Sequence, residues 1–387
     1  MKNLYYSLYA LFFISFSCTG LEQLSNQGQN TRLGKQSFEI KANKIMLEAR
    51  LDSVSYQWRF DSGSTLSGIS DTIGLKNKKV GKIPIVGAKL PDGNKFKEQF
   101  VTGNIENGFM SIKNKAFLMT PQMKPDNDCG EISGELTYTP KGIIGWDVFS
   151  NNDESFVELN FDKNEISTLS KSDFNSRVKD GYKPAEATFD ETTGHIYLPV
   201  KVGQKTYKFL FDTGYTGTIM PPFADKENLK SYHSMEMEGS FMKTLGGTVS
   251  DDRAFFAEDA DVLFAGNPMK ITTQSFSRFK EEYKNVGMIF IRNFNWLIDF
   301  NNEKVYIKPV IQKPENLKFP SDYKVRIINN KIFIIARNIK NTEYPVNAEI
   351  TSVNDVLVNK ENKCQILKQL NDTKDWKTLK LEIKKPN

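Results

Sequence analysis

The chain contains few of the residues on which metal sites and thiol or serine catalysis depend. Its 387 residues include two histidines, His195 and His233, and three cysteines. Two isolated histidines cannot supply an HExxH motif or a histidine-rich metal site. The sequence also has no GxSxG motif of the kind that presents a nucleophilic serine. We therefore predict no metal site and no cofactor, and we interpret both histidines as surface or packing residues.

Charge and cysteine content argue against two further classes of site. The 52 Lys and Arg residues and the 47 Asp and Glu residues are scattered along the chain, so no basic cluster predicts a nucleic-acid partner. Beyond the N-terminal segment only Cys129 and Cys364 remain. We expect them to lie in different domains, which argues against a structural disulfide. Neither is expected to be a nucleophile, because no histidine motif accompanies it.

The chain starts with Met-Lys-Asn, and a short apolar run, Leu4–Phe16, follows. This pattern predicts a secretory signal over residues 1–18, too short to span a bilayer comfortably. Ser15-Phe16-Ser17-Cys18 resembles a loose bacterial lipobox with a bulky Phe16, and Cys18 is then the lipidated residue; the alternative is plain secretion with an incidental Cys18. Residues 19–35 are expected to form a polar tether. We expect the protein outside the cytoplasm, in a bacterial periplasm or cell envelope, with membrane contact only through a lipid anchor at Cys18.

A short signature occurs twice, as Phe60-Asp61-Ser62-Gly63-Ser64-Thr65 and as Phe211-Asp212-Thr213-Gly214-Tyr215-Thr216. One copy is weak evidence, since Asp-Ser/Thr-Gly is common in turns. The residues before the two copies also match in register, at a constant offset of 151 positions. The matching positions are Ile45, Leu47, Ala49, Leu51, Tyr56, Trp58 and Phe60 in the first copy and Ile196, Leu198, Val200, Val202, Tyr207, Phe209 and Phe211 in the second. The sequence therefore predicts an internal repeat in which a hairpin leads into each signature.

The repeat continues downstream of both signatures. We match Gly142–Phe149 with Gly287–Phe294, which places Phe290 opposite Gly145. Two apolar strands then close each unit. Their matching positions are Leu159, Phe161 and Ile166 in the first unit and Ile298, Phe300 and Val305 in the second.

Over residues 36–310 this arrangement resembles the aspartic proteases in their two-lobed, single-chain form. The resemblance implies a mainly β fold with two pseudo-symmetric lobes, residues 36–170 and 171–310, whose Asp-Ser/Thr-Gly turns meet at a cleft. It makes Asp61 and Asp212 the catalytic pair. The turn residues that would hold the pair are Ser62, Gly63, Ser64, Thr65, Thr213, Gly214 and Thr216, with Ser62 and Thr213 hydrogen-bonded across the lobes. Tyr215 and Phe290 depart from the family pattern, which usually has Ser or Ala and Gly at these positions.

Two neighbouring carboxyl groups suit peptide hydrolysis for a separate chemical reason. Two aspartates within hydrogen-bonding distance cannot both ionise at low cost, so they share one proton. The ionised partner can draw a proton from a water molecule, and the protonated partner can polarise the substrate carbonyl. Gly63 and Gly214 let the two turns approach closely.

Two hairpins are candidates for flaps over the cleft. In the first half, Ile83–Val86 and Phe96–Phe100 flank an Asp-Gly turn, a strong hairpin signal. In the second half, Gly239–Met242 and Thr248-Val249 flank Leu245-Gly246-Gly247. Plain hairpins without a flap role are the alternative. The first hairpin has no tyrosine, so the lobes are more similar to the retroviral (retropepsin-like) type, duplicated in one chain, than to the pepsin-like branch.

The composition changes after Lys308, where three prolines indicate a linker. Residues 311–387 are expected to form a small α+β domain. Its expected elements are strands over Tyr323–Ile328 and Lys331–Ala336, a helix over Lys363–Leu370 and a strand over Trp376–Lys384. Ile350-x-Ser352-Val353-Asn354 is similar to a PDZ motif, although the Gly-rich carboxylate-binding loop of that family is not recognisable. A degenerate PDZ-like domain and a small packing domain both remain open interpretations.

The first hypothesis for function is an aspartic endopeptidase that acts as a monomer on peptides or proteins. The second is a peptide-binding protein that keeps the cleft but not the chemistry, and its motivation is Tyr215 and Phe290. A third places the carboxylate pair between two chains.

Overall fold

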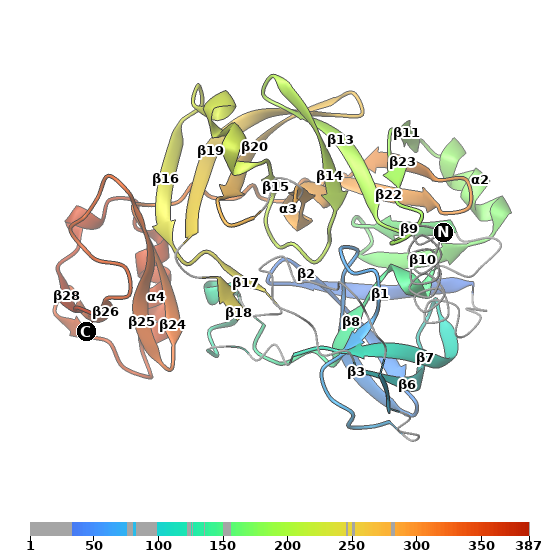
Figure 1. Ribbon diagram of the computed structural model, residues 1–387, viewed down its shortest axis with the longest axis horizontal. Coiled ribbons are helices and arrows are strands. Elements are labelled where there is room, and N and C mark those ends of the chain that lie inside the picture. Colours follow the sequence, from blue (N-terminus) through green and yellow to red (C-terminus); the bar gives the residue numbers. More distant parts are fainter. Residues whose placement is uncertain are drawn as a thin grey trace, which may run out of the picture.

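The computed structural model describes residues 33–75, 80–82, 99–121, 125, 127–134, 136–149, 156–244, 247–249, 252–279 and 283–386. Over these residues the protein is mainly β, as the sequence predicts. Figure 1 shows a small C-terminal group of strands, in red, beside the larger β structure. Cys18, the rest of the predicted signal and residues 83–98, which make up most of the first candidate flap, lie outside the described residues. In the described part of the chain, no helix has the length and apolar character needed to cross a membrane.

The first repeat is a barrel of strands that closes on itself. Alternating apolar residues place β2 (Lys44–Leu51) and β3 (Val54–Phe60) in a hairpin with the register Leu47↔Trp58. From β3 the pairing runs through β8 (Gly142–Ile144), β4 (Gly68–Ile69), β7 (Ser111–Met119) and β6 (Gln99–Glu106) and returns to β2. The strand β5 (Val80–Lys82) extends β6. Short 3-10 turns, η1 (Gly130–Ser133) and η2 (Trp146–Val148), follow β7 and β8.

The second repeat follows the same plan. The hairpin of β13 (Ile196–Val202) and β14 (Lys205–Phe211) has the register Leu198↔Phe209, which matches Leu47↔Trp58 at the predicted offset. The strand β14 pairs in parallel with β21 (Asn285–Val286), which pairs with β15 (Ile219–Met220). On the other side, β13 pairs with β12 (Thr188–Phe189) and with β19 (Asp252–Phe264), which lies between β20 (Asn267–Phe276) and β16 (Ser234–Gly239). The remaining elements are η3 (Phe223–Leu229), α3 (Met288–Ile291) and the hairpin β17 (Met242–Thr244)–β18 (Gly247–Val249). The second candidate flap is therefore a hairpin.

A shared sheet joins the two repeats. Its strand order is β11 (Lys183–Ala185), β23 (Lys304–Pro309), β22 (Phe294–Asp299), β9 (Phe156–Asn160), β10 (Glu165–Leu169) and β1 (Gly34–Lys41), so β1 begins inside the segment predicted as a tether. The repeats meet where Trp296 of β22 pairs with Leu159 of β9. The helix α2 (Lys171–Lys179) packs Phe174 on Phe156, with ring centroids 4.4 Å apart. One apolar core, which includes Trp58 and Trp296 at 0% exposure, runs through both repeats.

The C-terminal residues form a separate small core. The hairpin of β24 (Tyr323–Ile328) and β25 (Lys331–Asn338) and the helix α4 (Lys363–Asp372) lie where the sequence predicts a hairpin and a helix. The strands β26 (Glu349–Val353), β27 (Val356–Leu357) and β28 (Leu381–Lys384) complete the sheet. The predicted strand over Trp376–Lys384 is only partly right, because Trp376–Thr378 forms the 3-10 turn η4 that packs the Trp376 ring 4.7 Å from Tyr323.

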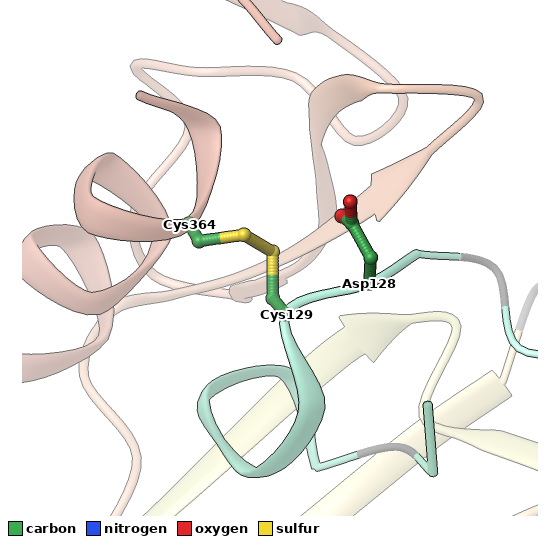
Figure 2. Close-up of side chains that lie close together, drawn as sticks. All are labelled: Asp128, Cys129 and Cys364. Carbon is green, nitrogen blue, oxygen red and sulfur yellow. A yellow bond between two sulfur atoms is a disulfide. The ribbon is translucent and has the colours of Figure 1, made fainter. Parts of the chain in front are cut away.

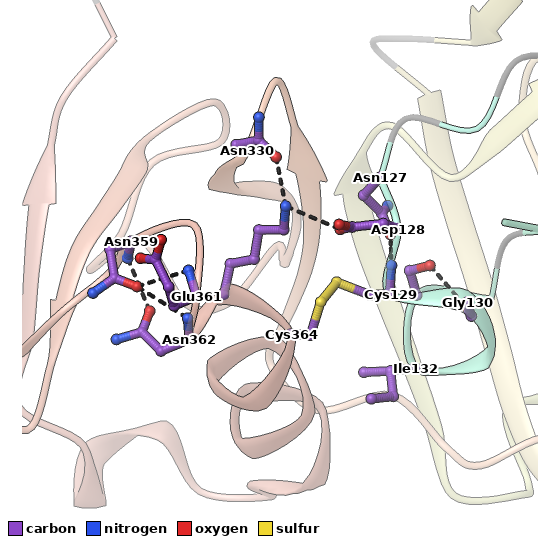
Figure 3. Close-up of a disulfide and its surroundings, with 12 residues drawn as sticks. Asn127, Asp128, Cys129, Gly130, Ile132, Asn330, Asn359, Glu361, Asn362 and Cys364 are labelled. Atoms are coloured by element: carbon purple, nitrogen blue, oxygen red, sulfur yellow. Dashed lines mark hydrogen bonds and ion pairs between the residues drawn. A yellow bond between two sulfur atoms is a disulfide. The ribbon is translucent and has the colours of Figure 1, made fainter.

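A strand pairing and a disulfide both join this C-terminal module to the rest of the protein. Strand β25 continues the sheet of the second repeat by pairing with β16, in the register Glu238↔Arg337. A disulfide joins Cys129, after β7 of the first repeat, to Cys364 at the start of α4 (Figure 3). The prediction that these cysteines do not pair is wrong: the module folds back against the first repeat, and the two Cα atoms lie 5.4 Å apart.

Candidate active site

The fold brings the two signature turns together, each at the end of a buried strand. The Asp61 amide donates to Ile144 O of β8, and the Asp212 amide donates to Val286 O of β21, both at 3.0 Å. Asp61 and Asp212 therefore occupy equivalent places in the two repeats, at the point where two parallel strands end.

Reciprocal hydrogen bonds lock the turns to each other. The Ser62 amide donates to Thr213 Oγ1 and the Thr213 amide donates to Ser62 Oγ, both at 2.8 Å. Each hydroxyl then donates onward to the opposite strand, Ser62 Oγ to Phe211 O at 2.8 Å and Thr213 Oγ1 to Phe60 O at 3.3 Å. Both side chains are 0% exposed. The cross-lobe contact expected for Ser62 and Thr213 is thus present, and we call these four bonds the cross-turn lock.

Each carboxylate faces the turn of the other repeat. Asp61 Oδ1 accepts from the Gly63 amide at 3.0 Å and Asp212 Oδ1 accepts from the Gly214 amide at 2.8 Å. A Cβ atom on Gly63 would lie 2.5 Å from Asp212 Oδ1, and one on Gly214 would meet the Asp61 carboxyl even more closely. Both positions need glycine because a carboxylate of the opposite turn fills the space beside them.

The electrostatics of the site favour one proton on the pair. Burial and, to a smaller extent, the charge of Asp61 raise the pKa of Asp212 to about 7, while Arg59 and two backbone amides act in the opposite direction. A carboxyl group with its pKa raised in this way keeps its proton at mildly acidic pH.

The downstream match of the two repeats needs a correction. Because Asp212 bonds to Val286 as Asp61 bonds to Ile144, the counterpart of Gly145 is Gly287 and not Phe290. The Trp146 amide donates to Ser64 O, and the Met288 amide likewise donates to Tyr215 O. The second repeat therefore has the glycine that the sequence comparison placed three residues too late. Phe290 lies in the apolar core at 0% exposure.

Tyr215, the second departure, does not extend its hydroxyl to the carboxylates. That hydroxyl accepts from Gln274 Nε2 on β20, and the side chain packs in a cluster with Met220, Met237 and Phe256. Gly217 and Gly287 make room for the ring, since a Cβ on either would lie within 2.6 Å of it. Burial raises the pKa of the Tyr215 hydroxyl, which therefore stays protonated.

The other predicted site residues lie on the same turns. Ser64 Oγ donates to Leu66 O at 2.7 Å, Thr65 Oγ1 lies 3.2 Å from His195 Nε2, and Thr216 is partly buried. His195, interpreted from the sequence as a surface or packing residue, thus contacts the first signature turn. Burial lowers its pKa, so the ring is neutral at pH 7.

Sequence reasoning missed two polar residues beside the pair. Arg59 Nη2 lies 3.6 Å from Asp61 Oδ2 and donates to Gly214 O across the repeats. Asn285 Nδ2 donates to Asp212 Oδ2 at 2.6 Å. An arginine two residues before Asp61 in an apolar strand was a visible signal, whereas Asn285 comes from a distant two-residue strand with no signal of its own.

A cluster of residue types that can bind metal ions lies at the disulfide, where Asp128, Cys129 and Cys364 gather (Figure 2). The two sulfur atoms are bonded to each other, and the Asp128 carboxylate pairs with Lys363 Nζ at 2.9 Å. This arrangement is that of a covalent cross-link with a flanking ion pair, and it presents no thiolate to a metal ion.

The cross-turn lock gives a prediction for stability. Thr213→Val keeps the shape of the side chain but leaves the buried Ser62 amide without its acceptor, so we expect a loss of about 1 to 3 kcal/mol in the free energy of unfolding. Denaturant unfolding measures it, with Thr206→Val, at an exposed position on the same strand, as the control. A Thr213→Val protein as stable as the control would contradict the lock.

Comparison of the chain with models of protein families and with curated proteins gives no match.

Proposed function

We propose that the protein is an aspartic endopeptidase that hydrolyses peptide bonds with water activated by Asp61 and Asp212. One observation carries the proposal: the cross-turn lock holds the two carboxylates against each other's turns, a geometry that two unrelated turn aspartates would not share. The raised pKa of Asp212 supports a shared proton on the pair.

In this mechanism the charged carboxylate is the general base for water, and the protonated one donates a hydrogen bond to the substrate carbonyl. The lock keeps the two carboxyl groups in place relative to each other during the reaction. The backbone amides of Gly63 and Gly214 orient Asp61 Oδ1 and Asp212 Oδ1, respectively. The reaction needs only the two carboxyl groups and water, so no cofactor is part of the proposal.

We also propose where the protein acts and in what form. A disulfide persists in an oxidising compartment, so the Cys129–Cys364 bond supports a location outside the cytoplasm, with Cys18 as a lipid anchor. The site is formed within one chain, which supports an active monomer. Residues 311–387 are proposed as a PDZ-like module whose peptide-binding role is open.

The test is incubation of the purified chain from Thr19 onward with a mixed peptide library between acidic and neutral pH. We expect endoproteolytic cleavage that is blocked by a peptide carrying a statine-type hydroxyl, which imitates the tetrahedral intermediate. Tight binding of library peptides without any cleavage would reject the proposal and favour the peptide-binding alternative.

A further inference from the structure

The polar layer behind the two carboxylates breaks the symmetry of the repeats. Arg59 pairs with Ile143 between β3 and β8, and at the equivalent place Leu210 pairs with Asn285 between β14 and β21. Each of these pairs has one polar residue: in the first repeat it lies on the strand that leads into the aspartate, and in the second repeat it lies on the neighbouring strand. The neutral Asn285 amide donates a hydrogen bond to Asp212, whereas the Arg59 cation lies beside Asp61.

The Arg59 side chain is 10% exposed, which makes its charge costly without nearby anions. Its Nη2 lies 3.6 Å from Asp61 Oδ2 and donates to Gly214 O of the second turn. Its Nε is buried and has no hydrogen-bond partner among the described residues. The guanidinium therefore contacts both active-site turns, and among the described residues its ion-pair partner is Asp61 of the carboxylate pair.

The charges around the pair leave Arg59 as the balancing group. Two carboxyl groups with one shared proton carry a single negative charge. Among the described groups near the pair, His195 is neutral at pH 7 because burial lowers its pKa, and the buried Tyr215 hydroxyl is protonated. Asn285 has no charge. Arg59 then brings the net charge of the site to zero when the pair holds one proton.

We propose that Arg59 is a positioning residue that ties the two active-site turns together and neutralises the singly protonated Asp61–Asp212 pair, so that it sets the pH range of that state. The role in activity rests on the proposed function. The electrostatic role does not, because it belongs to the pair whether or not peptides are cleaved.

The activity test compares the pH dependence of kcat/KM in the parent, Arg59→Met and Arg59→Lys. A cation near a carboxyl group favours its charged form, so Arg59→Met is expected to move the whole pH profile to higher pH by about 1 unit. Arg59→Lys keeps the charge but lacks the planar fork, so it should keep the profile and lower kcat. Arg50→Met, on the exposed far end of the same hairpin, should change neither.

A second readout does not depend on activity. Because the folded protein raises the pKa of Asp212, its melting temperature should fall as pH rises from about 4 to about 7. In Arg59→Met the midpoint of this fall should shift to higher pH. A chain that carries both Asp61→Asn and Asp212→Asn has no carboxyl pair to titrate. Adding Arg59→Met to that chain should therefore leave the pH dependence of its melting temperature unchanged.

An Arg59→Met protein that folds and keeps both the parental pH profile and the parental midpoint overturns the proposal. If Arg59→Met does not fold, Arg59→Gln is used in both measurements instead. If neither neutral variant folds while Arg59→Lys does, the requirement for a cation at this position is supported. A parent that cleaves no peptide, together with a shifted midpoint in Arg59→Met, rejects the proposed function and supports this inference.

Discussion

Replacement of Asp61 or Asp212 by asparagine is expected to lower the rate of peptide cleavage by about 10²- to 10⁴-fold, the usual contribution of general acid–base catalysis. An amide can neither accept the proton of the attacking water nor hold the shared proton. The two substitutions should have similar effects because in the proposed mechanism both carboxyl groups act on one water, and the double variant should lose little more than either single variant.

The same substitutions should leave the fold intact. The cross-turn lock uses Ser62, Thr213 and backbone atoms, and an asparagine oxygen can still accept from the amides of Gly63 and Gly214. A loss of activity through unfolding is therefore not expected. Asp180→Asn, at an exposed residue paired with Lys308, is the matched control and should keep parental activity. Full activity in either active-site variant would rule out the pair mechanism.

The raised pKa of Asp212 predicts how the stability of the folded protein changes with pH. The pKa of Asp212 is higher in the folded protein, about 7, than in the unfolded chain. The unfolded chain therefore loses this proton first, and the folded state loses stability as pH rises between about 4 and 7. Asp212→Asn removes that loss, so it should be more stable than the parent at pH 8. The pKa rises from 3.8 to about 7, and one pKa unit corresponds to about 1.4 kcal/mol, so the difference should be at most about 4 kcal/mol. Thermal unfolding of both proteins at pH 4 and pH 8 measures the difference.

The hairpins that carry the pair could be predicted because alternation fixes which face of a strand is buried. Leu47↔Trp58 and Leu198↔Phe209 pair in the predicted repeat, and a one-residue slip would have turned these side chains to solvent. Alternation could not fix the register of the later strands. Strand β21 has only two residues, too few to show an alternating pattern, so the sequence match placed the wrong residue opposite Gly145.

Contacts between distant segments were the other part that the sequence could not provide. Asn285 and His195 reach the carboxylate pair and the first turn from segments far from the first signature. The pairing of Cys129 with Cys364, 235 positions apart, required knowing that β25 joins β16 and so brings α4 back to the first repeat. Spacing alone carries no information on such a path.

Reduction of the Cys129–Cys364 bond is expected to lower the free energy of unfolding by about 2 to 4 kcal/mol, because a cross-link between distant residues restricts the unfolded chain. Cys129→Ser and Cys364→Ser should each reproduce the effect of the reductant. The variant with both serines should not respond to reductant at all, which separates the disulfide from other effects of the reagent. In the chain from Thr19 onward these are the only cysteines, so labelling of the unfolded, unreduced parent should find no free thiol.

The bond should also decide how unfolding proceeds. The first repeat is joined to the second through β9 and β22, the second is joined to the C-terminal module through β16 and β25, and the disulfide returns from the module to the first repeat. The three parts thus form a ring, and the module has its own apolar core around Trp376. When the ring is opened, the module keeps the β16–β25 pairing, the Asp128–Lys363 ion pair and its chain connection to β23, but it loses the covalent bond to the first repeat. We therefore expect a single unfolding transition in the oxidised protein. After reduction we expect an earlier, separate transition of the C-terminal module, visible as a step in tryptophan fluorescence that Trp376→Phe removes, since the other three tryptophans lie outside the module. Identical transitions with and without reductant would contradict the role of the bond as the third link of the ring.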